Sequence, residues 1–292
     1  MASKKPHPPT PQQPLRMPAV RPDFASAESS PHFALDRGVV VRRRANPPGQ
    51  VMPPHAHPFA TLTLVMGGGF SDEYESGTAE GAPLSVAFKP SGHPHATSVR
   101  GHGMRSLVIE IGPAIERRLR ACGALLHGCG VSTDPLIITR MVRVALTTLD
   151  SPGPQGEHAV DQALAALTQR ARGPMPAQPK GAAARALKLL ELEHAESTGT
   201  GSIAAELGLH PTSVTRMFRR SLGCGVMEHL RRLRVRAAAE RLANSALPLA
   251  LVACEAGFAD QAHMTRCFRR ETGVTPGLYR RLAGGQIPVT VA

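Results

Sequence analysis

Two stretches of the sequence place arginine and threonine side chains at a spacing that suits contact with nucleic acid bases. Residues 215–223 (TRMFRRSLG) recur as residues 265–273 (TRCFRRETG), and upstream residues 203–209 (IAAELGL) correspond to residues 252–258 (VACEAGF). Arginine can donate two hydrogen bonds to guanine, glutamine pairs in the same way with adenine, and threonine can contact the thymine methyl group. A duplicated unit bearing these side chains predicts a surface that reads base edges in DNA.

Each copy has the pattern of a helix-turn-helix, in which a short apolar helix, a glycine turn and a second helix follow one another. Gly208 and Gly257 are expected to end the first helix of each copy. Ser202 is placed to cap the first helix of copy one, Pro211 fits the first turn of its second helix, and Asp260 can cap the second helix of copy two.

One face of each second helix is apolar and should lie in the core. These core residues are Val214, Met217, Phe218 and Leu222 in the first copy, and Met264, Cys267 and Phe268 in the second. The opposite faces carry Thr212, Thr215, Arg216 and Arg219 in the first copy, and Gln261, Thr265, Arg266 and Arg269 in the second. A long helix at 226–243 should set the separation of the two units, and a separation of roughly 34 Å would let both enter successive major grooves.

A second group of residues resembles the two cupin motifs. Gly49, His55 and His57 carry the first motif, and residues 90–95 (PSGHPH) carry the second. In metal-binding cupins two histidines of the first motif, a glutamate and one histidine of the second motif hold the ion, so the resemblance implies His55, His57 and His95 as the histidines. Three imidazoles can hold zinc or iron. The glutamate position falls here at Thr61 or Leu62, which supply no carboxylate. We therefore expect no metal here, and expect the histidines to stabilise strand ends or line an effector pocket.

The secondary structure expected around these residues predicts an α+β fold, in which a cupin-like β-barrel is followed by an all-α domain. Short β-rich runs occur at 39–41, 61–65, 84–88 and 107–111, and Gly67-Gly68-Gly69 is among the clusters expected to separate them. The predicted segments are a Pro-rich disordered tail at 1–31, the barrel at 33–112, a helical dimerisation or covering region at 113–171, a linker at 172–181 and the helical domain at 182–284.

Composition favours a polyanionic partner. The 292 residues carry 34 Lys plus Arg against 22 Asp plus Glu, a formal net charge of +12. The five cysteines include no CxxC pair that could hold zinc. No apolar run reaches the roughly 18 residues that a membrane span needs. We expect a cytoplasmic protein with no membrane partner.

The helical domain resembles the DNA-binding domain of the AraC/XylS family of bacterial regulators over residues 182–282. The resemblance is carried by residues 256–261 (AGFADQ), then 266–270 (RCFRR), then 273–280 (GVTPGLYR). It implies base contacts from Thr212, Thr215, Arg216, Gln261, His263, Thr265 and Arg266, and phosphate contacts from Arg219, Arg220, Arg269 and Arg270. It also implies a structural role for Arg234 and a small-molecule effector for the cupin-like domain.

These observations predict a DNA-binding transcriptional regulator that is not an enzyme, is a homodimer and has RNA polymerase as a further candidate partner. Two alternatives stay open. A metal-dependent cupin enzyme, a dioxygenase or isomerase, would bind a stoichiometric metal at His55, His57 and His95. A protein-interaction bundle would use the arginine stripe to bind acidic partners, and its affinity for duplex DNA would lack the steep salt dependence of phosphate contacts.

Overall fold

A computed structural model of the protein describes residues 31–35, 38–75, 77–122, 129–148, 153–171, 181–196 and 199–284. The predicted disordered tail lies outside the described residues except for Pro31, and so does the predicted linker except for Gly181.

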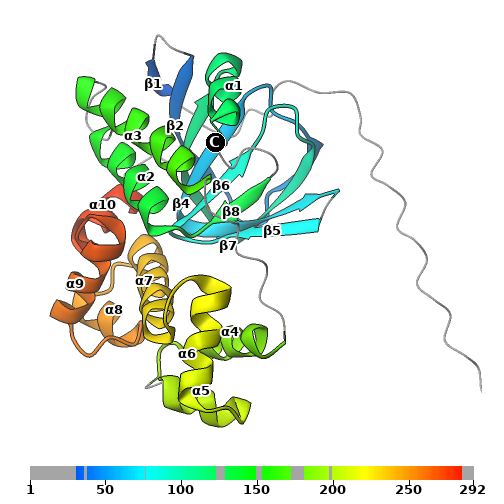
Figure 1. Ribbon diagram of the computed structural model, residues 1–292. Coiled ribbons are helices and arrows are strands. Elements are labelled where there is room, and N and C mark those ends of the chain that lie inside the picture. Colours follow the sequence, from blue (N-terminus) through cyan, green and yellow to red (C-terminus); the bar gives the residue numbers. More distant parts are fainter. Residues whose placement is uncertain are drawn as a thin grey trace, which may run out of the picture.

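The N-terminal half forms one antiparallel sheet (Figure 1). Its strands are β1 (Pro31–Leu35), β2 (Val39–Asn46), β3 (Val51–His55), β4 (Ala60–Tyr74), β5 (Gly77–Gly81), β6 (Ser85–Lys89), β7 (His95–Ile111) and β8 (Gly130–Ser132). The hydrogen-bonded order is β1-β2-β7-β4-β6-β8, with β3 paired to β7 and β5 paired to β4. The long strands β4 and β7 pair with each other along most of their length, and both contribute buried residues to the core, among them Leu64 and Ile109.

The four β-rich runs of the sequence all lie within or against strands, in β2, β4, β6 and β7. The prediction that Gly67-Gly68-Gly69 separates two strands was wrong, because β4 continues through it with two shifts of register. Gly68 has a φ of +72°, and a Cβ there would lie 1.6 Å from the carbonyl oxygen of Gly103. Glycine is therefore needed where β4 bulges against β7.

Two predicted boundaries also differ from the structure. The sheet begins with β1 at Pro31, before the predicted start at residue 33. The region 113–171 is not wholly helical, since β8 at Gly130–Ser132 pairs with β6. A three-residue strand carries too little periodicity to be recognised in the sequence.

Helices α1 (Pro113–Ala121), α2 (Pro135–Thr147) and α3 (Pro154–Ala171) complete the sheet domain. Helix α2 starts where Asp134 Oδ1 accepts a hydrogen bond from the Leu136 amide at 2.8 Å. Its apolar face, which includes Met141 and Ala145, is fully buried against the sheet core and α3. Helix α2 therefore packs against the sheet as well as against α3.

The C-terminal half is helical and contains two helix-turn-helix units joined by one long helix (Figure 1). The helices are α4 (Ala182–Glu193), α5 (Thr200–Leu207), α6 (Pro211–Leu222), α7 (Val226–Asn244), α8 (Leu249–Glu255), α9 (Gln261–Thr272) and α10 (Pro276–Gly284). We call α5–α6 the first unit and α8–α9 the second unit. No helix in the described ranges is both long enough and apolar enough to cross a membrane.

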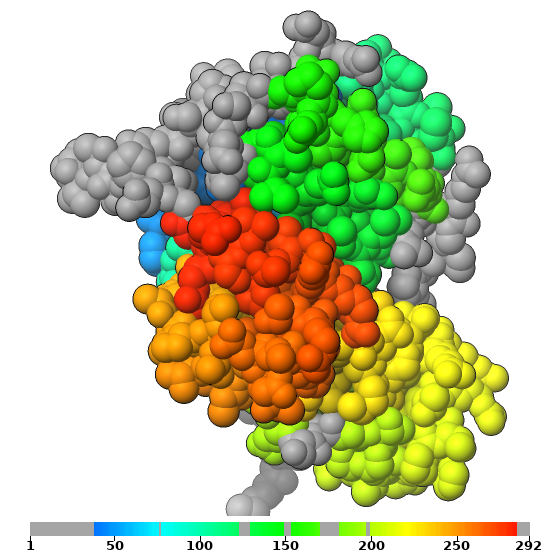
Figure 2. Space-filling model, turned by 90° about the vertical axis from the view of Figure 1, so that its left-hand side faces the viewer, coloured from blue at the N-terminus to red at the C-terminus, as the bar shows by residue number. Residues whose placement is uncertain are grey.

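The two units belong to different hydrophobic cores. The first unit packs with α4 and the first half of α7, whereas the second unit shares one core with α10, the second half of α7, the sheet, α2 and α3. Figure 2 shows α8–α10, in orange and red, directly against the green helices of the sheet domain. Polar contacts strengthen this junction: Tyr279 Oη donates to the carbonyl oxygen of Met66 at 2.7 Å, and Arg105 donates to Asn244 Oδ1 at 2.6 Å.

Candidate DNA-binding surface and histidine cluster

Helix α6 is fixed by its turn and by its buried face. Gly208, with a φ of +64°, ends α5, and Pro211 begins α6, as the sequence predicted. Val214 and Phe218 are buried, while Met217 and Leu222 are partly buried against the same core.

The prediction that Ser202 is the N-cap residue of α5 was wrong. Ser202 lies in the first turn of α5 rather than before it, and its hydroxyl oxygen accepts a hydrogen bond from the Gly199 amide at 2.8 Å. The glycine-rich start of α5 leaves the capping position to Gly199, a residue without a side chain to signal it.

Helix α9 is positioned in the same way by the second turn. Asp260 Oδ1 accepts a hydrogen bond from the His263 amide at 2.6 Å, so the predicted cap is confirmed. Gly257, with a φ of +81°, follows the end of α8. Met264, Cys267 and Phe268 are buried, as the repeat predicted.

The opposite faces of both helices point to solvent. The side chains of Thr212, Arg216, Arg219, Arg220, Gln261, Arg266, Arg269 and Arg270 are exposed, and those of Thr215, His263 and Thr265 are half-buried. The ring of His263 packs edge-on against Phe258, with centroids 5.4 Å apart, which restrains its position beside the exposed residues.

Few carboxylates neutralise the arginines on these two helix faces. Within the described residues, the arginines at 216, 219, 220, 266 and 269 form no ion pair, and Arg270 lies 3.6 Å from Glu271. Unpaired arginines on one helix face form a positive surface that attracts a polyanion.

Arg234 takes a different place, on α7 and away from these faces. Its guanidinium donates to the carbonyl oxygens of His194 and Glu196, each at 2.7 Å. It therefore ties α7 to the end of α4, as expected of a structural residue.

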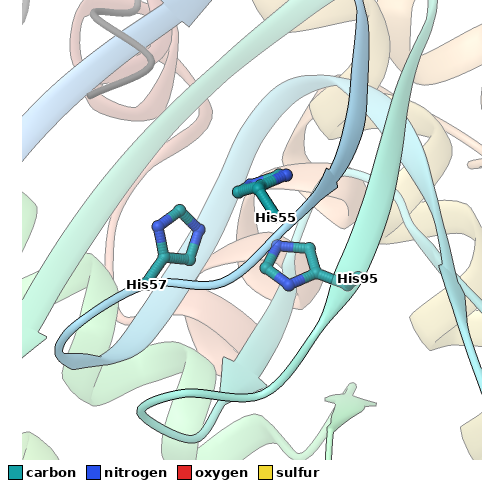
Figure 3. A group of neighbouring side chains, drawn as sticks. All are labelled: His55, His57 and His95. Carbon is teal, nitrogen blue, oxygen red and sulfur yellow. The ribbon is translucent and has the colours of Figure 1, made fainter. Parts of the chain in front are cut away.

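The three histidines of the sheet domain come together (Figure 3). His55 and His95 are directly opposite in the pairing of β3 with β7, and His57 follows two residues after the end of β3. One ligand atom from each ring lies within 4.8 Å of the others. His55 and His95 are buried, whereas His57 is only partly buried. His93 and His102 do not join this cluster.

Local hydrogen bonds orient two of these rings. His55 Nδ1 lies 2.8 Å from the carbonyl oxygen of Pro53, and His95 Nδ1 lies 3.1 Å from that of His93. Burial, helped by the other imidazoles and by Lys89, lowers the pKa of His57 and of His95 to about 3. Burial also lowers the pKa of His55. All three rings are therefore neutral at pH 7.

A buried polar network beside the cluster was missed in the sequence. Asp72 is fully buried and accepts hydrogen bonds from Thr97 at 2.5 Å and Tyr74 at 2.8 Å, while Lys89 Nζ lies 2.9 Å from its second oxygen. The ring of Tyr74 lies 6.0 Å from that of His95. Alternation along β4 could have flagged Asp72, but the glycine bulges obscure which residues of this strand face inward.

Two family models match the sequence, and together they cover both domains. One is described as an AraC-like ligand binding domain and matches residues 37–192, and the other is described as a helix-turn-helix domain and matches residues 203–282. The first match alone spans more than half of the chain. The chain belongs to the AraC family of transcription regulators.

Relatives of this AraC-family chain match only part of its length. A putative AraC-like transcription regulator from Streptomyces antibioticus is 29% identical over 98 residues, which cover 34% of this chain and 32% of the relative. The probable transcription factor PqrA from Proteus vulgaris is 31% identical over 106 residues, 36% of this chain and 85% of its own length. The chain spans about a third of the length of the first of these.

A solved structure of ToxT from Vibrio cholerae covers 84% of this chain and 98% of its own. Its identity is 11% and its TM-score is 0.37. Membership of the AraC family confirms the resemblance drawn from residues 182–282. The ligand-binding family model extends to residue 192, almost the end of α4, although α4 packs with the first unit.

Proposed function

We propose that this AraC-family chain regulates transcription by binding duplex DNA through α6 and α9. The observation that carries this proposal is the pair of matched second helices, each with a buried apolar face and an exposed face of unpaired arginines. A helix of a helix-turn-helix unit enters the major groove, where such side chains can reach base edges.

Base contacts are assigned to the exposed face and phosphate contacts to the flanking arginines. Thr212, Thr215, Arg216, Gln261, His263, Thr265 and Arg266 would contact bases, and Arg219, Arg220, Arg269 and Arg270 would contact phosphates. Arg219, Arg220, Arg269 and Arg270 lie in the last turns of α6 and α9. Such phosphate contacts would position the protein and give most of its affinity for any duplex.

The sheet domain would bind a small-molecule effector in the region of His55, His57 and His95. Support comes from its match to a ligand-binding family model and from its packing against the second unit. An effector that favours one arrangement of the two domains would shift the affinity for DNA. We further propose a cytoplasmic homodimer that acts on RNA polymerase. AraC-family regulators are typically not enzymes, and Thr61 and Leu62 supply no carboxylate to the cluster.

The test is DNA binding by single arginine variants. A duplex selected from a random pool by the wild-type protein serves as the specific site, and an unrelated duplex as the nonspecific one. Arg216→Ala and Arg266→Ala are each expected to weaken the specific complex about 5- to 150-fold, or about 1 to 3 kcal/mol, with a smaller effect on the unrelated duplex. Arg219→Ala should weaken both complexes equally and reduce the salt slope by about 1.

Arg117→Ala is the matched control, because it removes the same charge from an exposed position on α1 in the sheet domain. Its affinity for both duplexes should equal that of the wild type. Equal losses for Arg117→Ala and Arg216→Ala, or salt-independent binding of duplex, would contradict the assignment of α6 as a reading helix.

A further inference from the structure

The Nε2 atom of His95 is a buried polar atom without a hydrogen-bond partner among the described residues. The side chain of His95 is only 2% exposed. A buried nitrogen that accepts no hydrogen bond has lost its hydration without compensation, so such an atom calls for a specific explanation. One ring nitrogen of His95 lies within 4.8 Å of a ring nitrogen of His55 and of one of His57.

The local hydrogen bonds set the same tautomer in both paired histidines. A carbonyl oxygen only accepts, so the Nδ1 atoms of His55 and His95, which face the carbonyls of Pro53 and His93, must carry the hydrogen. In a neutral ring the lone pair is then on Nε2. Backbone contacts of this kind are the usual support of a histidine that binds a metal through its other nitrogen.

We propose that His55, His57 and His95 bind one divalent transition-metal ion and that this ion is the effector of the sheet domain. The second part rests on the proposed function, whereas the first part stands on the cluster alone. Nothing in the remaining described residues adds a carboxylate or thiolate to the three rings.

The donor set selects the class of ion. Three neutral imidazoles suit zinc, nickel, cobalt or copper, whereas magnesium and calcium require oxygen ligands. The ring centroids lie 4.4, 4.9 and 5.1 Å apart. A tetrahedral zinc ion holds its nitrogen ligands about 3.4 Å apart, so small rotations of the side chains would complete the site. His57, the partly buried member, lies at the solvent side.

The charges around the cluster are compatible with a cation. Lys89 is a positive group that influences all three rings, and its ammonium is paired with the buried carboxylate of Asp72 at 2.9 Å. Three protein ligands leave at least one coordination position for water or an anion, and an anion or hydroxide there would offset part of the charge of the ion.

The sheet connects this cluster to the DNA-binding units. His95 begins β7, and Arg105 on the same strand donates to Asn244 Oδ1 and to the carbonyl oxygen of Ala243 at the end of α7. Helix α7 joins the two helix-turn-helix units. A metal that draws β3 toward β7 would therefore act on the strand that holds the DNA-binding domain.

The test uses the untagged full chain, freed of metal with a chelator and titrated with zinc, cobalt(II) or magnesium chloride. We expect one zinc or cobalt ion per chain, no competition by magnesium, and a cobalt absorption spectrum typical of nitrogen ligands. His57→Ala should weaken zinc binding at least about a hundredfold, since even the loss of an outer-shell partner costs about 10- to 100-fold. His102→Ala, at an exposed histidine of β7 outside the cluster, should bind zinc as the wild type does.

His57 is the safest of the three positions to change because it is only partly buried, and the thermal midpoint of each metal-free variant checks its folding. Zinc should change the affinity of the wild type for its selected duplex at least about fivefold, and should not change that of His57→Ala. Metal-free protein that binds DNA but no zinc or cobalt would overturn the proposal and leave the proposed function intact. Metal binding that survives His57→Ala overturns the site, and binding without an effect on DNA affinity overturns the effector role.

Discussion

At the scale of single residues, the buried pair of Asp72 and Lys89 is a costly arrangement, because both charges are removed from water. The carboxylate has no exposure and the lysine side chain is 12% exposed, so both charges have left water. Burial lowers the pKa of Lys89, while the contact with Asp72 acts in the opposite direction. Thr97 and Tyr74 each donate a further hydrogen bond to the carboxylate, and such additional hydrogen bonds offset the cost of burying an ion pair.

Replacement of Asp72 by asparagine should therefore be strongly destabilising. The variant keeps the size of the side chain but leaves Lys89 without its counter-charge in a buried place. We expect the free energy of unfolding to fall by about 3 kcal/mol, measured by urea denaturation. Glu80→Gln is the control, because Glu80 pairs with Arg100 at the surface with 67% of its side chain exposed, and it should cost less than about 0.5 kcal/mol. Equal costs for the two variants would show that Asp72 has no special role.

At the scale of elements, the two helix-turn-helix units use the same turn in different surroundings. Gly208 and Gly257 both have positive φ. A Cβ on Gly208 would meet nothing within 4 Å, whereas a Cβ on Gly257 would lie 2.7 Å from Ala195 Cα and 2.8 Å from the carbonyl oxygen of His194. The second turn is thus packed against the chain that leaves α4.

An alanine at each turn should separate the strain of a left-handed backbone from the cost of a steric clash. Gly208→Ala introduces only the strain of a left-handed residue, about 1 kcal/mol. Gly257→Ala adds a clash with backbone atoms that cannot move independently, and we expect a loss of about 3 kcal/mol or more. Chemical denaturation measures both values. Two similar losses of stability would mean that the backbone of residues 194–195 can move away from the added methyl group without a cost in free energy.

Local patterns predicted the helical domain better than the sheet domain. Gly208, Pro211, Asp260 and the apolar faces of α6 and α9 are determined within a few neighbouring residues, and the repeat doubled the signal. The inward placement of Asp72 depends on bulges that only the pairing of β4 with β7 creates. His55, His57 and His95 were identified through the resemblance to the cupin motifs, but their convergence and the unpartnered Nε2 of His95 follow from the register of β3 on β7.

At the scale of the whole molecule, the division into cores does not follow the division into domains. The first unit has a small core of its own with α4 and the start of α7. The second unit shares a single core with the sheet, α2 and α3, and Tyr279 and Arg105 add hydrogen bonds across the junction. Helix α7 contributes Leu230 and Leu233 to the first core, and Val235 and Leu242 to the second. The sheet domain and the second unit should therefore unfold together, and the first unit separately.

The repeat supplies a matched pair of residues for testing this division. Phe218 and Phe268 occupy the same position in the two copies, are 1% and 0% exposed, and lie in different cores. Each phenylalanine-to-alanine change should cost about 3 to 5 kcal/mol in the core that it serves. Scanning calorimetry of the wild type should show a smaller transition below a larger one. Phe218→Ala should lower only the smaller transition, and Phe268→Ala, which also removes a ring contact with Tyr279 at 5.2 Å, should lower the larger one. A single transition shifted equally by both changes would mean that the two cores unfold as one cooperative unit through α7. The two reading helices would then respond to the sheet domain as one rigid body.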